Sequence, residues 1–162
     1  MSLRTDSDRF LLDGMLGILA RKLRMLGLDA EFSADADPAM IRYRSRAEAR
    51  IVLTRNPKLV KILGDGGWLV TGTDAREEFQ SLVPLLRMIK PSRDPFSRCL
   101  DCNTRLVNAT REQARDSVPY YVWKNTEHFM TCSSCDKNYW KGTHHRRMLD
   151  EVREMEEELK QG

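Results

Sequence analysis

The sequence has no long apolar run, and this absence limits the kinds of protein it can encode. No stretch approaches the roughly 20 apolar residues that a membrane-spanning helix needs. Residues 1–10 lack the apolar core of a secretory signal peptide. We therefore expect a cytoplasmic protein, in a compartment where thiols stay reduced. Apolar residues make up 41% of the chain and charged residues 31%, which is typical of a globular protein.

Two nucleotide-binding motifs are also missing. No G-x-G-x-x-G follows the first predicted strand, and the chain has no P-loop, so neither signature points to a dinucleotide or a nucleoside triphosphate. Charge is unevenly distributed, because residues 1–147 carry a net charge of +7 and residues 148–162 carry −4. The basic part favours a polyanionic partner such as nucleic acid, although an ordinary solvated surface explains the charge equally well.

Cysteine is scarce, but its spacing is informative. The four cysteines form two C-x2-C pairs separated by 29 residues, and they are Cys99, Cys102, Cys132 and Cys135. Four thiolates fill the tetrahedral shell that Zn²⁺ prefers and leave no position for a water molecule. We therefore predict structural Zn²⁺ in a zinc ribbon. The alternatives are two disulfides, four free thiols or an iron–sulfur cluster.

Apolar periodicity predicts alternating strands and helices before the cysteines. The predicted strands are 9–13, 29–34, 50–54 and 68–71, and the predicted helices are 14–26, 38–49, 57–63 and 77–89. Such alternation predicts an α/β fold with an open, mostly parallel sheet and helices on both faces. Residues 91–95 form a linker. A further strand is expected at 120–123 within the ribbon.

Acidic and amide side chains follow the ends of these predicted strands. They are Asp13, Asp35, Asp37, Asn56 and Asp74. Because the carboxyl ends of parallel strands share one edge of a sheet, these side chains are expected to converge there. Oxygen ligands of this kind bind Mg²⁺ or Mn²⁺, which activates water for phosphodiester hydrolysis. The alternative is that Asp37 only caps a helix and Asp74 only a loop.

Several sequence strings together resemble one known family. They are Phe10-Leu-Leu-Asp-Gly-Met-Leu-Gly17, Leu19-Ala-Arg-Lys-Leu-Arg-Met-Leu-Gly-Leu-Asp29, Arg50-Ile-Val-Leu-Thr-Arg55, the two cysteine pairs and Tyr139-Trp-Lys-Gly-Thr-His144. In this combination the chain resembles the prokaryotic PIN-like family named for the C-terminal RNase domain of Mut-seven, over residues 9–148. The resemblance implies a PIN-like sheet, an appended zinc ribbon and a metal-dependent ribonuclease, which we expect to be endonucleolytic.

The resemblance also implies specific site residues. The family's first acid falls on Asp13, and the acid that opens its second helix falls on Asp37. The family's third strand usually runs Thr-Arg-Asp, whereas this chain has Asn56 at the last position. Asparagine offers a neutral oxygen without a charge, so this departure predicts weaker metal binding. Asp74 is added to the predicted site by its strand position.

Basic and aromatic residues give the expected RNA contacts. Arg21, Arg24 and Arg55 are predicted to hold phosphates, and His144 and His145 are predicted to lie near RNA. Beside the histidines, Tyr139 or Trp140 can stack on a base. The alternative is that Trp140 packs against the sheet and fixes the ribbon to the nuclease domain.

The predicted domains are a PIN-like nuclease domain at 1–94, a zinc ribbon at 95–148 and a charged helical tail at 149–162. The tail is expected to be solvated or covered by a partner, or else to lie on the basic helix that bears Arg21, Lys22 and Arg24 and to block nucleic acid there. Two further functions stay open beside the ribonuclease. One is a catalytically weakened RNA- or ribonucleoprotein-binding protein. The other is a zinc adaptor that binds protein through its ribbon or acidic tail.

Overall fold

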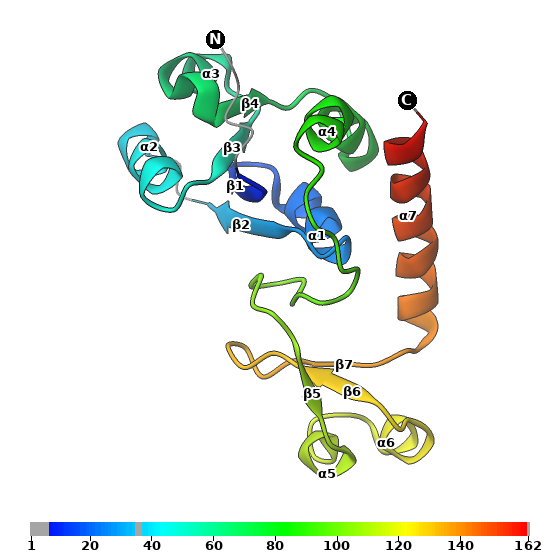
Figure 1. Cartoon of the computed structure of the whole chain (residues 1–162). Coiled ribbons are helices and arrows are strands. Elements are labelled where there is room, and N and C mark those ends of the chain that lie inside the picture. Colours follow the sequence, from blue (N-terminus) through cyan, green and yellow to red (C-terminus); the bar gives the residue numbers. More distant parts are fainter. Residues whose placement is uncertain (1–6, 35–36, 162) are drawn as a thin grey trace.

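A four-stranded parallel sheet organises the first half of the chain in the computed structural model, which describes residues 7–34 and 37–161 (Figure 1). Its strands are β1 (Arg9–Asp13), β2 (Asp29–Ser33), β3 (Ile51–Thr54) and β4 (Gly67–Leu69). The strand order is β2-β1-β3-β4. This confirms the predicted α/β sheet.

Helices cover both faces of this sheet. The helices on one face are α1 (Gly17–Met25) and α4 (Ala75–Ile89), and those on the other are α2 (Pro38–Ala47) and α3 (Pro57–Leu63), which is followed by the short helix η1 (Gly64–Gly66). Successive side chains of a strand point to opposite faces, so Phe10 and Leu12 pack toward α1 and α4 while Leu11 packs toward α2 and α3. This explains why β1 is apolar throughout.

The ribbon is built on a second, antiparallel sheet. Its strands are β5 (Val107–Ala109), β6 (Phe129–Thr131) and β7 (Asn138–Tyr139). Two short helices, α5 (Arg111–Ala114) and α6 (Tyr120–Asn125), lie between β5 and β6. The predicted strand at 120–123 is therefore wrong. Pro119 begins a helical turn there, and its carbonyl accepts hydrogen bonds from the backbone N–H groups of Val122 and Trp123.

Helix α7 (Thr143–Lys160) leaves the ribbon and runs beside α1 and α4 (Figure 1). Val152 and Met155 are buried in the main core, and Lys22 of α1 pairs with Glu151 at 2.7 Å. The tail is therefore not simply solvated: its contact with the basic helix is confirmed, whereas a block of nucleic acid stays untested. None of the helices within the described ranges is long and apolar enough to cross a membrane.

The linker packs tightly against the end of α1. Gly27 has φ +82°, and a Cβ atom at this position would lie 2.1 Å from the backbone oxygen of Asp94. The backbone N–H of Phe96 donates to the Met25 carbonyl at 3.0 Å, and Arg98 Nε donates to the Gly27 carbonyl at 3.2 Å. Glycine is required here because it alone permits this approach of two backbones.

Candidate functional site

Asp13 ends β1 at the point where the sheet order reverses. β1 and β3 are neighbours, and the chain proceeds from them toward opposite edges of the sheet. Ligands of open parallel sheets bind outside the carboxyl ends of strands at such a point. The Asp13 side chain is nearly buried and its Oδ2 accepts a hydrogen bond from Thr54 Oγ1 at 3.0 Å. Burial raises the pKa of Asp13, and the Thr54 hydrogen bond opposes that rise.

The other predicted site residues begin helices at this edge. Asp37 accepts from the backbone N–H of Ala39, and Asn56 Oδ1 accepts from those of Lys58 and Leu59. These bonds make Asp37 and Asn56 the N-caps of α2 and α3.

Asp74 has the same role at the start of α4, where Oδ1 accepts from the backbone N–H groups of Arg76 and Glu77 at 2.8 and 2.9 Å. Each of these three caps satisfies backbone N–H groups that a helix start leaves unpaired. The capping role is thus observed for Asp37, Asn56 and Asp74, whereas metal binding by them stays a prediction. Asp35 lies outside the described residues.

Glu78 is an acid at this edge that the sequence analysis missed. It is buried in the first turns of α4, and its Oε1 lies 3.6 Å from Arg55 Nη1. Burial raises the pKa of Glu78, Arg55 opposes the rise and Asp74 adds to it. The helical spacing of the sequence could have revealed this burial, because Glu78 shares the inward face of α4 with Leu82 and Leu85.

The acids at this edge do not form a closed ligand set. Within residues 7–34 and 37–161, the one group of three or more His, Cys, Asp or Glu side chains placed to share an ion is the cysteine quartet. Metal binding by Asp13 and by the other acids at this edge therefore stays a prediction.

The cysteine quartet fits a zinc ion. Its members are Cys99, Cys102, Cys132 and Cys135, with sulfur atoms that all lie within 4.8 Å of one another. Neighbouring sulfurs are 3.3–3.5 Å apart. A disulfide needs about 2.05 Å, whereas four sulfurs about 2.3 Å from one Zn²⁺ are about 3.8 Å apart. The four thiols are unbonded to each other and can hold one zinc ion.

Both cysteine pairs sit in the same type of turn. The backbone N–H of Asn103 donates to the Cys99 carbonyl at 3.0 Å, and that of Asp136 donates to the Cys132 carbonyl at 2.9 Å. Asn103 and Asp136 have φ values of +70° and +53°. Asparagine and aspartate tolerate this left-handed conformation better than other non-glycine residues, so their position directly after C-x2-C supports the turn.

Asn103 also joins the ribbon to the parallel sheet. Its side chain is buried, and its Oδ1 accepts from the backbone N–H of Ala30 at 3.0 Å. Its Nδ2 donates to Asp29 Oδ1 at 2.8 Å and to Glu31 Oε1 at 3.1 Å. One side chain therefore connects the first cysteine turn to three residues of β2.

The predicted phosphate-binding face of α1 is occupied by the protein itself. Arg24 is buried, and its Nη1 donates to the carbonyls of Leu100 and Asp101 at 2.9 Å. Arg21 pairs with the Asp101 carboxylate. Arg24 is thus not exposed to a phosphate, contrary to the expectation, whereas Arg55 and Arg21 keep roughly half of their side-chain surface exposed.

The residues from Tyr139 to His145 differ in their surroundings. Tyr139 packs against the main core, and its hydroxyl lies 3.1 Å from Cys99 Sγ. Trp140 packs against the small core of the ribbon, formed by Ala114, Val122 and Phe129, and not against the nuclease sheet. His144 is exposed. The attachment to the main core that was considered for Trp140 is made by Tyr139.

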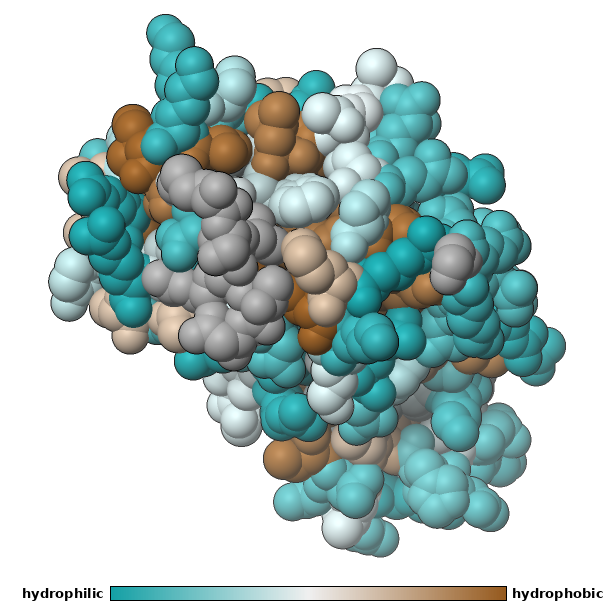
Figure 2. All heavy atoms as spheres, turned by 45° about the horizontal axis from the view of Figure 1, so that its top comes forward, coloured by the Kyte–Doolittle hydropathy of each residue, from teal (hydrophilic) through white to brown (hydrophobic). Residues whose placement is uncertain are grey.

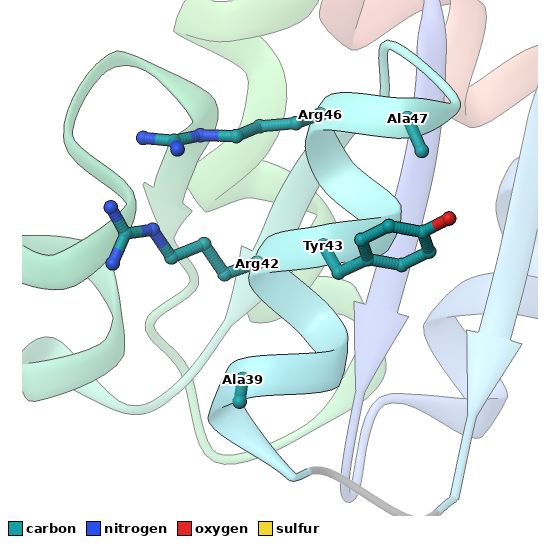
Figure 3. Close-up of a pocket in the computed structure, with 5 residues that line it drawn as sticks. All are labelled: Ala39, Arg42, Tyr43, Arg46 and Ala47. Atoms are coloured by element: carbon teal, nitrogen blue, oxygen red, sulfur yellow. The ribbon is translucent and has the colours of Figure 1, made fainter.

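The outer surface of α2 carries unpaired basic groups beside apolar ones. Figure 3 shows Arg42 and Arg46 extending from the same side of the helix, while the Tyr43 ring lies on another side. Tyr43 is 67% exposed. The face of the molecule in Figure 2 is mostly hydrophilic with separate apolar patches. Arg42 lies in the middle of α2, whereas Arg46 lies in its last turn, at the end of the helix away from Asp37.

Comparison with known families identifies the chain. No curated protein and no solved structure matches it. The family described as the Mut7-C RNAse domain matches residues 8–152, which include the sheet, the cysteine quartet and the first half of α7. This match confirms the resemblance inferred from the sequence strings. The chain belongs to the Mut7-C RNAse domain family.

Proposed function

We propose that this protein is a metal-dependent ribonuclease that cleaves single-stranded RNA internally, with Asp13 as its central metal ligand. The observation that carries the proposal is the buried Asp13 carboxylate at the point where the strand order reverses. Its hydrogen-bond partner there is neutral Thr54. A buried carboxylate beside a neutral partner is stabilised by a bound cation, and Mg²⁺ or Mn²⁺ is a suitable one.

The remaining groups have distinct proposed roles. The family membership supports RNA as the substrate. Asp37 and Asp74 cap helices through one carboxylate oxygen each, so the second oxygen of each can bind the ion directly or through water. Arg55, which lies beside Glu78 and is about half exposed, and Arg42 on α2 are placed to attract phosphates.

The test is Asp13→Asn in the full, zinc-loaded chain. The substitution keeps the size of the side chain and removes its charge, so Mn²⁺-stimulated cleavage of a single-stranded RNA should fall at least about 100-fold. The matched control is Asp65→Asn, which changes an acid in η1 and should leave cleavage unchanged. Equal cleavage by the Asp13 variant and the control would refute the assignment.

A second candidate function is RNA binding with weak or no cleavage, and Asn56 is the observation that favours it. Its side-chain oxygen is engaged as the cap of α3 and carries no charge. Aspartate caps a helix as well as asparagine does, so Asn56→Asp changes the charge at this edge while it retains the cap. A strong rise in Mn²⁺-dependent cleavage in this variant would show that the native site is weakened. Unchanged cleavage would show that Asn56 is not a lost ligand.

A further inference from the structure

A cleft of about 740 Å³ lies between the ribbon and the start of α7. Arg98 in its wall contacts Gly27, which precedes β2, and Asp29, which is the first residue of β2. The cleft is therefore near the amino ends of the strands, whereas Asp13 and Thr54 lie at their carboxyl ends. It is a site separate from the proposed nuclease centre.

Planar rings of the ribbon and of the first turn of α7 line the cleft. They belong to Phe96, His128, Tyr139, Trp140 and His145. The rings of Phe96 and His145 have centroids 4.5 Å apart. The Tyr139 hydroxyl is fixed by the backbone N–H of Leu100, which donates to it at 3.2 Å. Rings of this kind stack on nucleobases of any sequence.

Two polar groups of the cleft residues have no hydrogen-bond partner in the described part of the chain. Ser97 Oγ is buried and unpaired. The indole N–H groups of Trp68 and Trp123 donate to the carbonyls of Ser81 and Arg111, but that of Trp140 has no corresponding acceptor. The Trp140 N–H is not buried and can donate to a ligand in the cleft, whereas Ser97 Oγ is shielded from it.

The start of α7 is electrostatically unfavourable without an anion. Its N-cap is Gly142, which makes no side-chain cap, and its first turn contains no acid. The sequence at 143–147 is Thr-His-His-Arg-Arg, so basic side chains surround the positive end of the helix dipole. A phosphate at this end would receive backbone N–H groups and neighbouring cations.

Two cations of the cleft are uncommitted, whereas Arg98 pairs with Asp29. Lys141 and Arg146 line it, are exposed and have no ion-pair partner among the described residues. This distinguishes them from Lys22 and Arg24 on α1, which are engaged within the protein. Asp94 is the acidic residue of the lining and is exposed at its rim. The side chains of the cleft therefore favour a ligand that combines a flat aromatic group with negative charge.

We propose that this cleft binds one nucleotide of a single-stranded RNA. The base lies among the rings of Phe96, Tyr139 and Trp140, and the adjoining phosphates lie at the start of α7 against Lys141 and Arg146. The choice of RNA as the polymer rests on the proposed ribonuclease function. The ribbon then holds one part of the RNA, and cleavage takes place in another part, at the carboxyl ends of the strands.

The proposed phosphate contacts are tested by RNA binding. The assay measures binding of a fluorescein-labelled 12-nucleotide RNA to the zinc-loaded full chain in the absence of Mg²⁺ and Mn²⁺. Lys141→Ala with Arg146→Ala should raise Kd about tenfold and reduce the slope of log K against log salt by about 1.4, because each phosphate contact on a single strand contributes about 0.7. The control is Arg153→Ala with Lys160→Ala, which removes two exposed cations of α7 outside the cleft, of which Arg153 pairs with Asp150. Equal affinity of the two double variants would overturn the proposal.

Nuclear magnetic resonance tests whether a base lies among the rings of the cleft. The indole ¹H–¹⁵N signal of Trp140, assigned with Trp140→Phe, should shift when the RNA is added and should not shift with an abasic strand of equal length. An equal shift with both strands, or none with RNA, would contradict a base in the cleft. Cleavage with Mn²⁺ is measured separately. RNA binding in the cleft without any cleavage that depends on Asp13 contradicts only the nuclease proposal. Cleavage that depends on Asp13 without binding in the cleft contradicts only the cleft proposal.

Discussion

At the scale of single residues, Thr54 connects two parts of the proposed nuclease centre. It is fully buried, donates to Asp13 Oδ2 at 3.0 Å and accepts from the backbone N–H of Asn56 at 3.0 Å. One hydroxyl thus orients the Asp13 carboxylate and supports the start of α3. Its removal would leave a buried acceptor and a partly buried donor without their partner.

Thr54→Val tests this connection, because valine has nearly the same shape and lacks the hydroxyl. The free energy of unfolding should fall by about 1–3 kcal/mol, and Mn²⁺-dependent cleavage should fall with it. Urea unfolding and an RNA cleavage assay measure the two effects. Thr54→Ser keeps the hydroxyl and should retain most cleavage. If serine and valine reduce cleavage equally, the hydroxyl does not orient Asp13.

At the scale of elements, α7 is part of the core of the nuclease sheet. Met155→Ala should lower the free energy of unfolding by about 2–4 kcal/mol, because it opens a cavity between α7 and the main core. Arg153→Ala on the exposed side of the same helix should change it by less than about 0.5 kcal/mol. Urea unfolding of both variants provides the measurement, and equal effects would argue against a docked α7.

Most elements of residues 9–89 could be predicted because their local signals agree. Pro38 and Pro57 begin helices directly after the caps Asp37 and Asn56, and β1 is a short apolar run. The prediction of a strand at 120–123 was wrong because it gave more weight to the β propensity of tyrosine, valine and tryptophan than to the turn that Pro119 begins. Packing overrode propensity there, since the Trp123 indole donates to the Arg111 carbonyl.

The candidate site was only partly accessible from the sequence. The predicted end of the first strand at Asp13 is confirmed, whereas its role in a metal site stays a prediction. The sequence did not reveal that Arg24 is buried, since its partners at Leu100 and Asp101 are distant in the chain. The docking of α7 did have a signal, namely apolar residues spaced by four, three and four positions, which the many glutamates obscured: Met148, Val152, Met155 and Leu159.

The junction between β2 and the ribbon depends on the charge of Asp29. Burial alone would raise the pKa of Asp29, but hydrogen bonds from Arg50 and Asn103 and the charges of Arg50 and Arg98 lower it overall. A carboxyl whose pKa is lower in the folded state stabilises the protein above its unfolded pKa of about 3.9. That contribution is lost as the pH falls through the folded pKa.

Asp29→Asn should therefore cost about 2 kcal/mol at pH 7, and the difference from the native protein should shrink as the pH falls below about 4. Chemical unfolding at several pH values measures this difference directly. Asp8→Asn, at an exposed position before β1, is the control and should cost little at any pH. A difference that stays constant down to pH 3 would show that the ionised form of Asp29 is unimportant.

At the scale of the whole molecule, zinc in the ribbon should support the nuclease sheet. The first cysteine turn reaches β2 through Asn103 and α1 through Arg24. Removal of zinc should therefore lower the melting temperature by about 10 °C or more and increase hydrogen exchange in β2 and α1 as well as in the ribbon. Hydrogen exchange with and without chelator measures this. Exchange that increases only in the ribbon would show that the two parts are uncoupled.

The two proposed RNA sites lie at opposite ends of the strands. β1 has five residues and spans about 16 Å, so an RNA that reaches both sites must extend over several nucleotides. Oligonucleotides too short to reach both should lose the benefit of the cleft. The length dependence of binding is thus a property of the whole molecule.

The contact between Asn103 and Ala30 has a further consequence for self-association. β2 is an edge strand of the sheet, and an exposed edge can add a strand from another molecule and begin aggregation. Asn103 occupies the backbone N–H of Ala30 in the middle of that edge. The ribbon therefore hinders the pairing of another strand with this part of the edge, and its loss would expose the Ala30 N–H to such pairing.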